Sequence, residues 1–183
     1  TVEAIPDTSA RIGFPQVLKG EGVPHKTESG AVKLNLKSSE ETCSAAASMS
    51  ATSFLIEEMI TGTIAELLIG VVRDPAHGFV LTIGAGGTLT EILQDSVSLL
   101  IPASDQQVET ALDQLRISPL LHGYRGAPAA DRNAILRAIR AVQDYTIANA
   151  DGLHEIEINP LICTTTDAIA ADALLRRAEK ETP

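Results

Sequence analysis

The chain has 183 residues, of which 44% are hydrophobic and 3% aromatic, and its formal net charge is -10 at pH 7. This length and composition support a packed core in one domain or two small lobes and exclude a disordered chain. The acidic charge would repel polyphosphate backbones, so we expect no general nucleic-acid binding, and any phosphate site must be local.

The two cysteines, Cys43 and Cys163, belong to no CxxC motif or Cys/His cluster. A disulfide scaffold or a zinc site is therefore not expected, and free thiols in a reducing cytosol fit better. No apolar run reaches the ~18 residues of a membrane span, and no basic region followed by an apolar stretch begins the chain. We expect a cytoplasmic protein without a membrane partner. Because the chain begins at Thr1 rather than Met, we also expect a processed product or part of something longer.

The first part of the chain predicts a hairpin around a glycine-rich, basic loop. Residues 16–19 and 31–36 predict two short strands, and the residues between them are dense in Gly, Pro and polar groups. Glycines free a backbone to wrap an anion, and Lys19, His25 and Lys26 place positive or protonatable groups beside it. The segment is either an anion-binding loop or a flexible basic turn.

The elements around this hairpin follow from local signals. Pro6 is expected to interrupt any helix in the first twelve residues. Residues 38–51 begin with serines and acids, which predict a helix start followed by an Ala-rich helix. Residues 54–60, 66–72 and 79–83 predict three strands at short spacing, which suggests an antiparallel meander.

A glycine-rich stretch at residues 84–88 ends this meander. It lacks both the GxGxxG spacing and a Walker lysine, so it is neither a dinucleotide fingerprint nor a P-loop. A phosphate nest and a simple bend between sheet segments remain open. Further on, residues 104–115 have amphipathic helical spacing, and Asp131 is expected to cap a helix that runs to about residue 148.

The stretch from His154 to Leu161 predicts a strand with oxygen donors on one face. Side chains alternate along a strand, so Glu155, Glu157 and Asn159 share one side. Neighbours on that side lie ~6.5 Å apart, close enough to share a hard cation. Pro160 is expected to end the ladder because it has no N–H. The stretch is either a cation-binding ridge or an ordinary solvated strand.

Residues 168–171 predict a returning strand, after which Asp172 is expected to open a terminal helix. Asp172 would then lie across a hairpin from Asn159, and with Glu157 these residues could form a carboxylate–amide cage for magnesium. The element order predicts an α/β (α+β) fold. We expect a small N-terminal lobe, residues 1–53, and a larger lobe, residues 54–183, with nucleotide in the cleft between them.

Several segments stand in an order that is specific in combination, although no single segment is. They read GFPQVLK, HKTESGAV, FLIEEMITGTIAELLIGVVRDPAHGFVLTIGAGGTLTEILQD, LLHGYRG and HEIEINPL followed by AADALL. Together they cover nearly the whole chain, and it resembles the ATP-grasp domain of the NDP-forming acyl-CoA synthetases, a group related to the β subunit of succinyl-CoA synthetase. The resemblance implies an ATP-grasp fold, two lobes each with a largely antiparallel sheet and flanking helices.

The resemblance implies that ATP and ADP are bound with Mg²⁺. On this basis Lys19 contacts the phosphates of ATP, and Glu66 faces the nucleotide. Glu57, Glu58 and Met59 form the hinge that holds adenine and ribose, partly through the backbone.

The resemblance also implies the metal ligands and a covalent relay. Asn159 and Asp172 would hold magnesium with help from Glu157. His25, in the HK motif, would carry a phosphoryl group, and Glu91 would lie where the phosphohistidine docks. Phosphoryl transfer needs charge neutralisation and positioning, which a lysine and magnesium can supply, and a neutral imidazole is nucleophilic near pH 7.

The implied reaction converts acid, CoA and ATP to acyl-CoA, ADP and phosphate through phosphohistidine. Compared with the family, the interval from Lys19 to His25 is short, and the CoA-binding and CoA-ligase domains are missing. We therefore expect one subunit or fragment whose partner is the α subunit or those domains, with a small carboxylic acid and CoA as indirect substrates. The alternative is a non-catalytic regulatory module, such as the synthetase-like part fused to a lysine acetyltransferase. A carboxylate–amine ligase is a third option, which the histidine-containing loop argues against.

Overall fold

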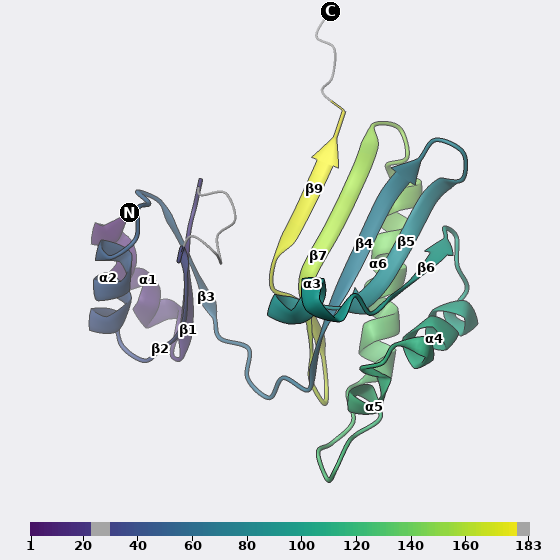
Figure 1. Ribbon diagram of the computed structural model, residues 1–183. Coiled ribbons are helices and arrows are strands. Elements are labelled where there is room, and N and C mark those ends of the chain that lie inside the picture. Colours follow the sequence, from purple (N-terminus) through teal and green to yellow (C-terminus); the bar gives the residue numbers. More distant parts are fainter. Residues whose placement is uncertain (23–29, 179–183) are drawn as a thin grey trace, which may run out of the picture. The chain divides into compact units, whose positions relative to one another are not determined.

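The computed structural model describes residues 1–22 and 30–178 (Figure 1). The chain divides into two compact units, Thr1–Thr61 and Gly62–Pro183. The sequence placed this division between the lobes 1–53 and 54–183. The division falls later because the strand that follows residue 53 is hydrogen-bonded into the sheet of the first unit.

The first unit is a three-stranded antiparallel sheet with two helices on one of its faces (Figure 1). β1 (Gln16–Gly20) is the central strand and pairs with β2 (Val32–Leu36) and β3 (Phe54–Glu58). The predicted hairpin of β1 and β2 is confirmed. α1 (Ile5–Ile12) and α2 (Ser39–Ala47) pack against each other over the sheet.

α1 begins at Ile5 and contains Pro6, which was expected to interrupt any helix here. A short 3-10 turn, η1 (Val2–Ala4), leads into the helix, and Pro6 lies in its first turn. An N–H in the first turn of a helix has no intrahelical partner, so a proline there costs no hydrogen bond, and its fixed φ suits a helix. The expectation that Pro6 interrupts the helix is wrong. Ser9 of α1 accepts a hydrogen bond from Gln16 Nε2 at 2.8 Å through its carbonyl oxygen, which ties the helix to β1.

The core of the first unit is small. Leu18 of β1 packs with Ile5 of α1 and Ala46 of α2, each at most 1% exposed. α2 starts where the sequence predicted, because Ser38 caps it by accepting a hydrogen bond from the Glu41 N–H at 3.2 Å. The helix is shorter than predicted and ends at Ala47.

The second unit is built on a larger antiparallel sheet, in the order β6-β5-β4-β7-β8, with β9 also paired to β7. Its central strands are long, and β4 and β7 make the most extensive pairing. The strands are β4 (Ala65–Asp74), β5 (Gly78–Ala85), β6 (Ser96–Leu100), β7 (Leu153–Cys163), β8 (Ala168–Ala170) and β9 (Ala173–Arg177).

The helices of residues 105–148 cover one face of this sheet (Figure 1). Leu67, Ile69 and Val71 alternate along β4 toward that face and are fully buried against Leu112 and Ile139 of the covering helices. None of the helices in the described part of the chain is both long enough and apolar enough to cross a membrane. The helical elements are η2 (Gly87–Leu89), α3 (Thr90–Leu93), α4 (Asp105–Gln114), α5 (Ser118–Leu121) and α6 (Arg132–Ala148).

The two long helices of this unit begin at polar caps. The Asp131 side chain accepts a hydrogen bond from the Ala134 N–H at 3.0 Å, which confirms the predicted start of α6. α4 has a reciprocal capping box between Ser104 and Gln107. Both predicted helices are thus confirmed. They could be predicted because side-chain caps are local sequence signals.

The predicted meander of three strands is wrong in its first member. β3 pairs with β1, with Gln16 opposite Glu58, whereas β4 pairs with β5 and β7. The meander that does form is β4, β5 and β6. Sequence spacing favours neighbouring strands as partners, but here β3 completes the sheet that covers α1 and α2.

The predicted terminal helix is also wrong, since Ala173–Arg177 is strand β9. Its residues Ala, Leu and Arg are good helix formers. However, the edge of β7 from Leu153 to Ile158 offers free backbone groups, and β9 pairs with them. Backbone pairing at an open sheet edge overrides a weak local preference.

Pro160 does not end the ladder of β7. The strand continues to Cys163 with an irregularity in its pairing to β4 between Leu67 and Ile69. Its other neighbour changes at this point, because β9 pairs with Leu153–Ile158 and β8 pairs with Leu161–Cys163. Proline therefore marks a change of partner in the middle of the strand.

Candidate functional site

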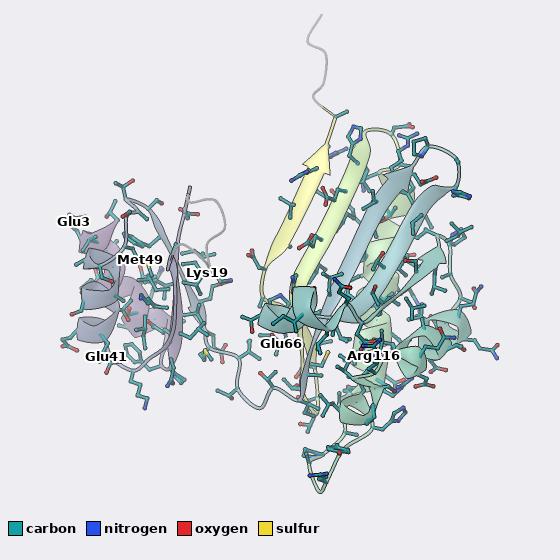
Figure 2. The ribbon with its side chains drawn as sticks, viewed as in Figure 1. Glu3, Lys19, Glu41, Met49, Glu66 and Arg116 are labelled. Atoms are coloured by element: carbon teal, nitrogen blue, oxygen red, sulfur yellow. The ribbon has the colours of Figure 1, made fainter. Side chains whose placement is uncertain are left out.

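The predicted site residues of the first unit meet on β1 and β3. Leu18 points to the helices, so Lys19, the next residue on β1, points to the opposite face of the sheet. Figure 2 labels Lys19. Lys19 is 9% exposed, and its Nζ lies 2.5 Å from Glu57 Oε2 on β3. An ammonium group with little solvent around it can offer strong charge stabilisation to a phosphate.

The predicted hinge residues lie at the end of β3. Glu57 stands opposite Val17, and Glu58 stands opposite Gln16. The Met59 N–H donates to the Pro15 carbonyl oxygen at 3.0 Å, so this backbone donor already extends the pairing of β1 with β3. The role of these three residues in holding adenine and ribose stays a prediction.

In the second unit, Asn159 and Asp172 are direct neighbours. The Asn159 N–H donates to the Asp172 carbonyl oxygen at 3.1 Å, and the Asp172 carboxylate accepts from the Ala173 N–H at 3.1 Å. The prediction that Asp172 lies across from Asn159 is confirmed, although the turn between them leads to a strand and not to a helix. Their role as metal ligands stays a prediction.

The acids of β7 share a face, as alternation predicts. Glu155 pairs with Val72 and Glu157 with Gly70 across β4, while Ile156 between them points into the core. Glu155 Oε2 lies 3.2 Å from Arg176 Nη1 on β9. Glu155 thus has a structural partner on the neighbouring strand.

Glu66 and Asn159 both contact the glycine-rich loop that precedes α3. The Gly86 N–H donates to the Glu66 carbonyl oxygen, and the Gly87 N–H donates to Asn159 Oδ1, at 2.8 and 2.9 Å. A Cβ at Gly87 would overlap Glu66 Oε2, so the Glu66 carboxylate fills the place where a side chain would stand. Figure 2 labels Glu66 in the second unit. The loop therefore gathers a carboxylate and an amide from two neighbouring strands.

These side chains suit magnesium by their chemistry. Carboxylate and amide oxygens are the hard donors that Mg²⁺ prefers, and magnesium in nucleotide sites keeps waters and phosphate oxygens with only one or two carboxylates. In the described ranges, 1–22 and 30–178, no group of three or more His, Cys, Asp and Glu side chains is arranged to hold a metal ion. A site completed by phosphates is consistent with this donor set.

The structure does not describe the side chains of the two residues predicted to relay the phosphoryl group. His25 lies outside the described residues. The backbone of Glu91 forms part of α3 (Thr90–Leu93), while its side chain also lies outside what the structure describes. Both roles stay predictions.

Sequence reasoning missed Gly87 and Asp95. Asp95 is 8% exposed, and its carboxylate accepts from the Arg116 and Ile117 N–H groups at 2.9 and 3.1 Å. Its carbonyl oxygen accepts from the Ala85 N–H, so it closes the loop that carries the glycines. The paired glycines were a visible signal, but only the folded structure shows which side chains they meet.

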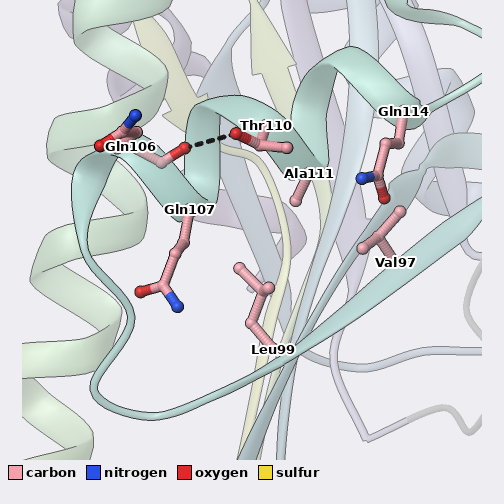
Figure 3. Close-up of a pocket in the computed structure, with 7 residues that line it drawn as sticks. All are labelled: Val97, Leu99, Gln106, Gln107, Thr110, Ala111 and Gln114. Atoms are coloured by element: carbon pink, nitrogen blue, oxygen red, sulfur yellow. Dashed lines mark hydrogen bonds between the residues drawn. The ribbon is translucent and has the colours of Figure 1, made fainter.

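A hollow of about 280 Å³ lies elsewhere in the second unit, between β6 and α4 (Figure 3). Val97 and Leu99 form its floor, and the Thr110 hydroxyl on its wall donates to the Gln106 carbonyl oxygen at 2.8 Å. None of the predicted site residues that the structure describes lines it. It is lined by Val97, Leu99, Gln106, Gln107, Thr110, Ala111 and Gln114.

A family model described as an ATP-grasp domain matches residues 1–176. The chain belongs to the ATP-grasp domain family. This confirms the predicted fold class, a mixed α/β fold with antiparallel sheets.

Relatives of this ATP-grasp domain include ligases that form acyl-CoA. The chain is 36% identical over 190 residues to a trans-feruloyl-CoA synthase of an unknown prokaryotic organism, covering 94% of this chain and 26% of that protein. It is 29% identical to the β subunit of the ADP-forming acetate–CoA ligase I of Pyrococcus furiosus, covering 90% of this chain and 76% of that subunit. The chain thus spans about a quarter of one relative and about three quarters of the other.

Solved structures agree with the fold of the ATP-grasp domain. The dinucleotide-forming acetyl-coenzyme A synthetase 1 of Ca. Korarchaeum cryptofilum, in complex with coenzyme A and Ca-AMPCP, superposes with a TM-score of 0.86 at 29% identity, covering 97% of this chain and 82% of that one. A second structure of that enzyme, with Mg-AMPPCP and its phosphohistidine segment pointing towards the nucleotide-binding site, gives a TM-score of 0.85 at 30% identity.

Proposed function

We propose that this chain is the nucleotide-binding, phosphoryl-transferring part of an ADP-forming acyl-CoA synthetase. The observation that carries the proposal is the cluster of Glu66, Asn159 and Asp172 in a chain related to such enzymes along nearly its whole length. The Korarchaeum relative is described with a magnesium nucleotide analogue and a phosphohistidine segment, which supports the same chemistry here.

In this proposal the residues of the first unit handle the phosphates and the base. The Lys19 ammonium neutralises phosphate charge, and its pairing with Glu57 holds it in place while no nucleotide is bound. Glu58 and Met59 hold adenine and ribose at the end of β3. A nearly buried lysine is suited to this because its charge is poorly screened by solvent.

The second unit would hold magnesium through Asn159 and Asp172, with Glu157 and Glu66 beside them. When bound, magnesium would neutralise charge on the phosphate oxygens during transfer. Asn159 is well prepared for this, because its Oδ1 is held by the Gly87 N–H and keeps a second lone pair for the metal.

His25 is proposed as the covalent relay. Its imidazole nitrogen attacks the γ-phosphorus of ATP, the bond to the ADP oxygen breaks, and the phosphohistidine then passes its phosphoryl group to the acyl-forming part of the enzyme. Glu91 would receive the phosphohistidine segment. The partner in this scheme is a CoA-binding domain or α subunit, where the carboxylic acid and CoA react, and the free thiols of Cys43 and Cys163 support a cytoplasmic setting.

Isothermal titration with ATP and magnesium tests this proposal. We expect the wild-type chain to bind Mg-ATP, and Asn159→Ala to weaken binding by about 10–100-fold, the loss typical of removed metal-site groups. Asn133→Ala is the matched control, since Asn133 is exposed on α6 and the same amide is removed there. We expect the control to bind as the wild type does.

Two outcomes contradict the proposal in different ways. Absence of heat with the wild-type chain, or equal binding by Asn159→Ala, would reject the nucleotide site. Binding of ATP without acid-labile phosphate on His25, after incubation with ATP and the partner, would instead identify a non-catalytic module of the same fold.

A further inference from the structure

Gly87 makes three contacts that bear on the proposed magnesium site. Its N–H donates to Asn159 Oδ1 at 2.9 Å, and its Cα lies against the Glu66 carboxylate. Its carbonyl oxygen accepts from Thr90 Oγ1 at 2.7 Å at the start of α3. One residue with no side chain therefore touches both site side chains and the helix that follows.

The first contact decides which end of the Asn159 amide is held. An amide side chain carries an acceptor oxygen and a donor nitrogen, and only the oxygen can accept the Gly87 N–H. The oxygen is also the atom that ligates a hard cation. The backbone of Gly87 thus selects the orientation of Asn159 in which the metal-binding atom is fixed.

The second contact depends on the missing Cβ. The Cβ of any other residue at position 87 would clash with Glu66 Oε2. The blocking atom belongs to the end of a flexible side chain, so a methyl group would push the carboxylate aside without breaking the fold. Gly86 differs, because a Cβ there would meet the backbone of Leu67 and Leu68, which cannot move aside.

We propose that Gly87 is a positioning residue of the magnesium–nucleotide site, setting the Asn159 amide through its N–H and the Glu66 carboxylate through its missing side chain. This inference rests on the proposed function. The hydrogen bond from Thr90 also ties Gly87 to the start of α3 (Thr90–Leu93). Gly86, by contrast, has a structural role.

Gly87→Ala separates positioning from folding when it is compared with a glycine of similar backbone. Gly87 and Gly78 have φ angles of +74° and +82°, but a Cβ at Gly78 meets nothing within 4 Å. Both alanine variants carry the same backbone strain, and only Gly87→Ala displaces Glu66. Their melting temperatures should therefore fall by similar amounts.

The measurement is isothermal titration of ATP at a series of Mg²⁺ concentrations, and of ATP alone in the presence of a chelator. For Gly87→Ala we expect about a 10–100-fold higher Mg²⁺ requirement for ATP binding, with metal-free ATP affinity unchanged. Gly78→Ala should match the wild type in both titrations. A melting temperature loss in Gly87→Ala without a change in Mg²⁺ requirement would overturn the proposal.

Glu66→Asp provides a second test of the proposal. The shorter side chain withdraws the carboxylate from the space that the methyl group needs, so the double variant Gly87→Ala/Glu66→Asp should fold and require less Mg²⁺ than Gly87→Ala. Absence of this rescue would show that the Glu66 contact is not the cause. Failure of the wild type to bind Mg-ATP would reject the proposed function, whereas wild-type binding that Gly87→Ala preserves would reject only the role of Gly87.

Discussion

Cys163 lies near the end of β7 with no exposed surface, and burial raises the pKa of its thiol to about 12. The ordinary value is 9.0, so the folded chain holds the thiol proton more tightly than the unfolded chain does. The stabilisation linked to this proton is complete below about pH 9 and is lost as the pH rises toward 12. A single buried side chain thereby makes stability pH-dependent on the alkaline side.

Comparing the wild type with Cys163→Ala isolates this effect. We expect the variant to be less stable at pH 8, because a buried side chain is shortened. The difference in the free energy of unfolding should shrink by about 1.4 kcal/mol between pH 8 and pH 10, since the alanine variant has no thiol to ionise there. Urea unfolding at both pH values measures it, and a difference that stays constant would contradict the buried, protonated thiol.

At the scale of elements, α6 shows how a local signal and a tertiary one reinforce each other. Asp131 accepts from the Ala134 N–H, and its own N–H donates to the Thr164 carbonyl oxygen at 2.9 Å. The residue therefore caps the helix and ties it to the end of β7. Its pairing with Arg137 is long, at 3.8 Å, and Arg137 is exposed, so the charge itself contributes little.

Asp131→Ala should lower the free energy of unfolding by about 0.5–2 kcal/mol, because the helix loses its capping acceptor. Asp131→Asn keeps an oxygen in the same place and should recover most of that stability. Urea unfolding of the three proteins measures both effects. If Asn is as destabilising as Ala, the negative charge rather than the hydrogen bond holds the start of α6.

At the scale of the whole molecule, the two units have very unequal cores. Among the described residues, the packed core cluster of Thr1–Thr61 joins only Ile5, Leu18 and Ala46 as buried members, with Val17 and Ala31 buried beside it. The buried core of Gly62–Pro183 joins residues from the three strands β4, β5 and β7 and from α4, α5 and α6. Stability rises with buried apolar surface, and small domains bury a lower fraction of their surface.

We therefore expect residues 62–183 to fold when produced alone, with cooperative thermal unfolding followed by circular dichroism. Residues 1–61 alone should be largely unfolded, because so small a core does not offset the chain entropy lost on folding. Proton–deuterium exchange of each fragment would give the same contrast. Cooperative unfolding of the isolated first unit would contradict the inference that its small core is too weak to fold it alone.

Local patterns predicted much of the chain. The strand β7, the helix α6 with its Asp131 cap, and the proximity of Asn159 and Asp172 all follow from alternation, helical spacing and turns, because these signals act over a few residues. The same patterns suggested an anion-binding loop beside Lys19 and a cation-binding ridge on β7 but left simpler alternatives open, and the resemblance to a family then implied the roles in binding ATP phosphates and magnesium.

The sequence by itself determined where most strands and capped helices begin, because caps, periodicity and turn residues act within one or two turns of chain. Only the tertiary structure decided the partner of β3, the conversion of a helix-forming segment into β9, and the contact of Gly87 with Glu66 and Asn159. Each of these depends on groups brought together from distant parts of the chain. A free sheet edge affects a segment only when the fold places that segment beside it, and a missing Cβ matters only when another side chain fills its space.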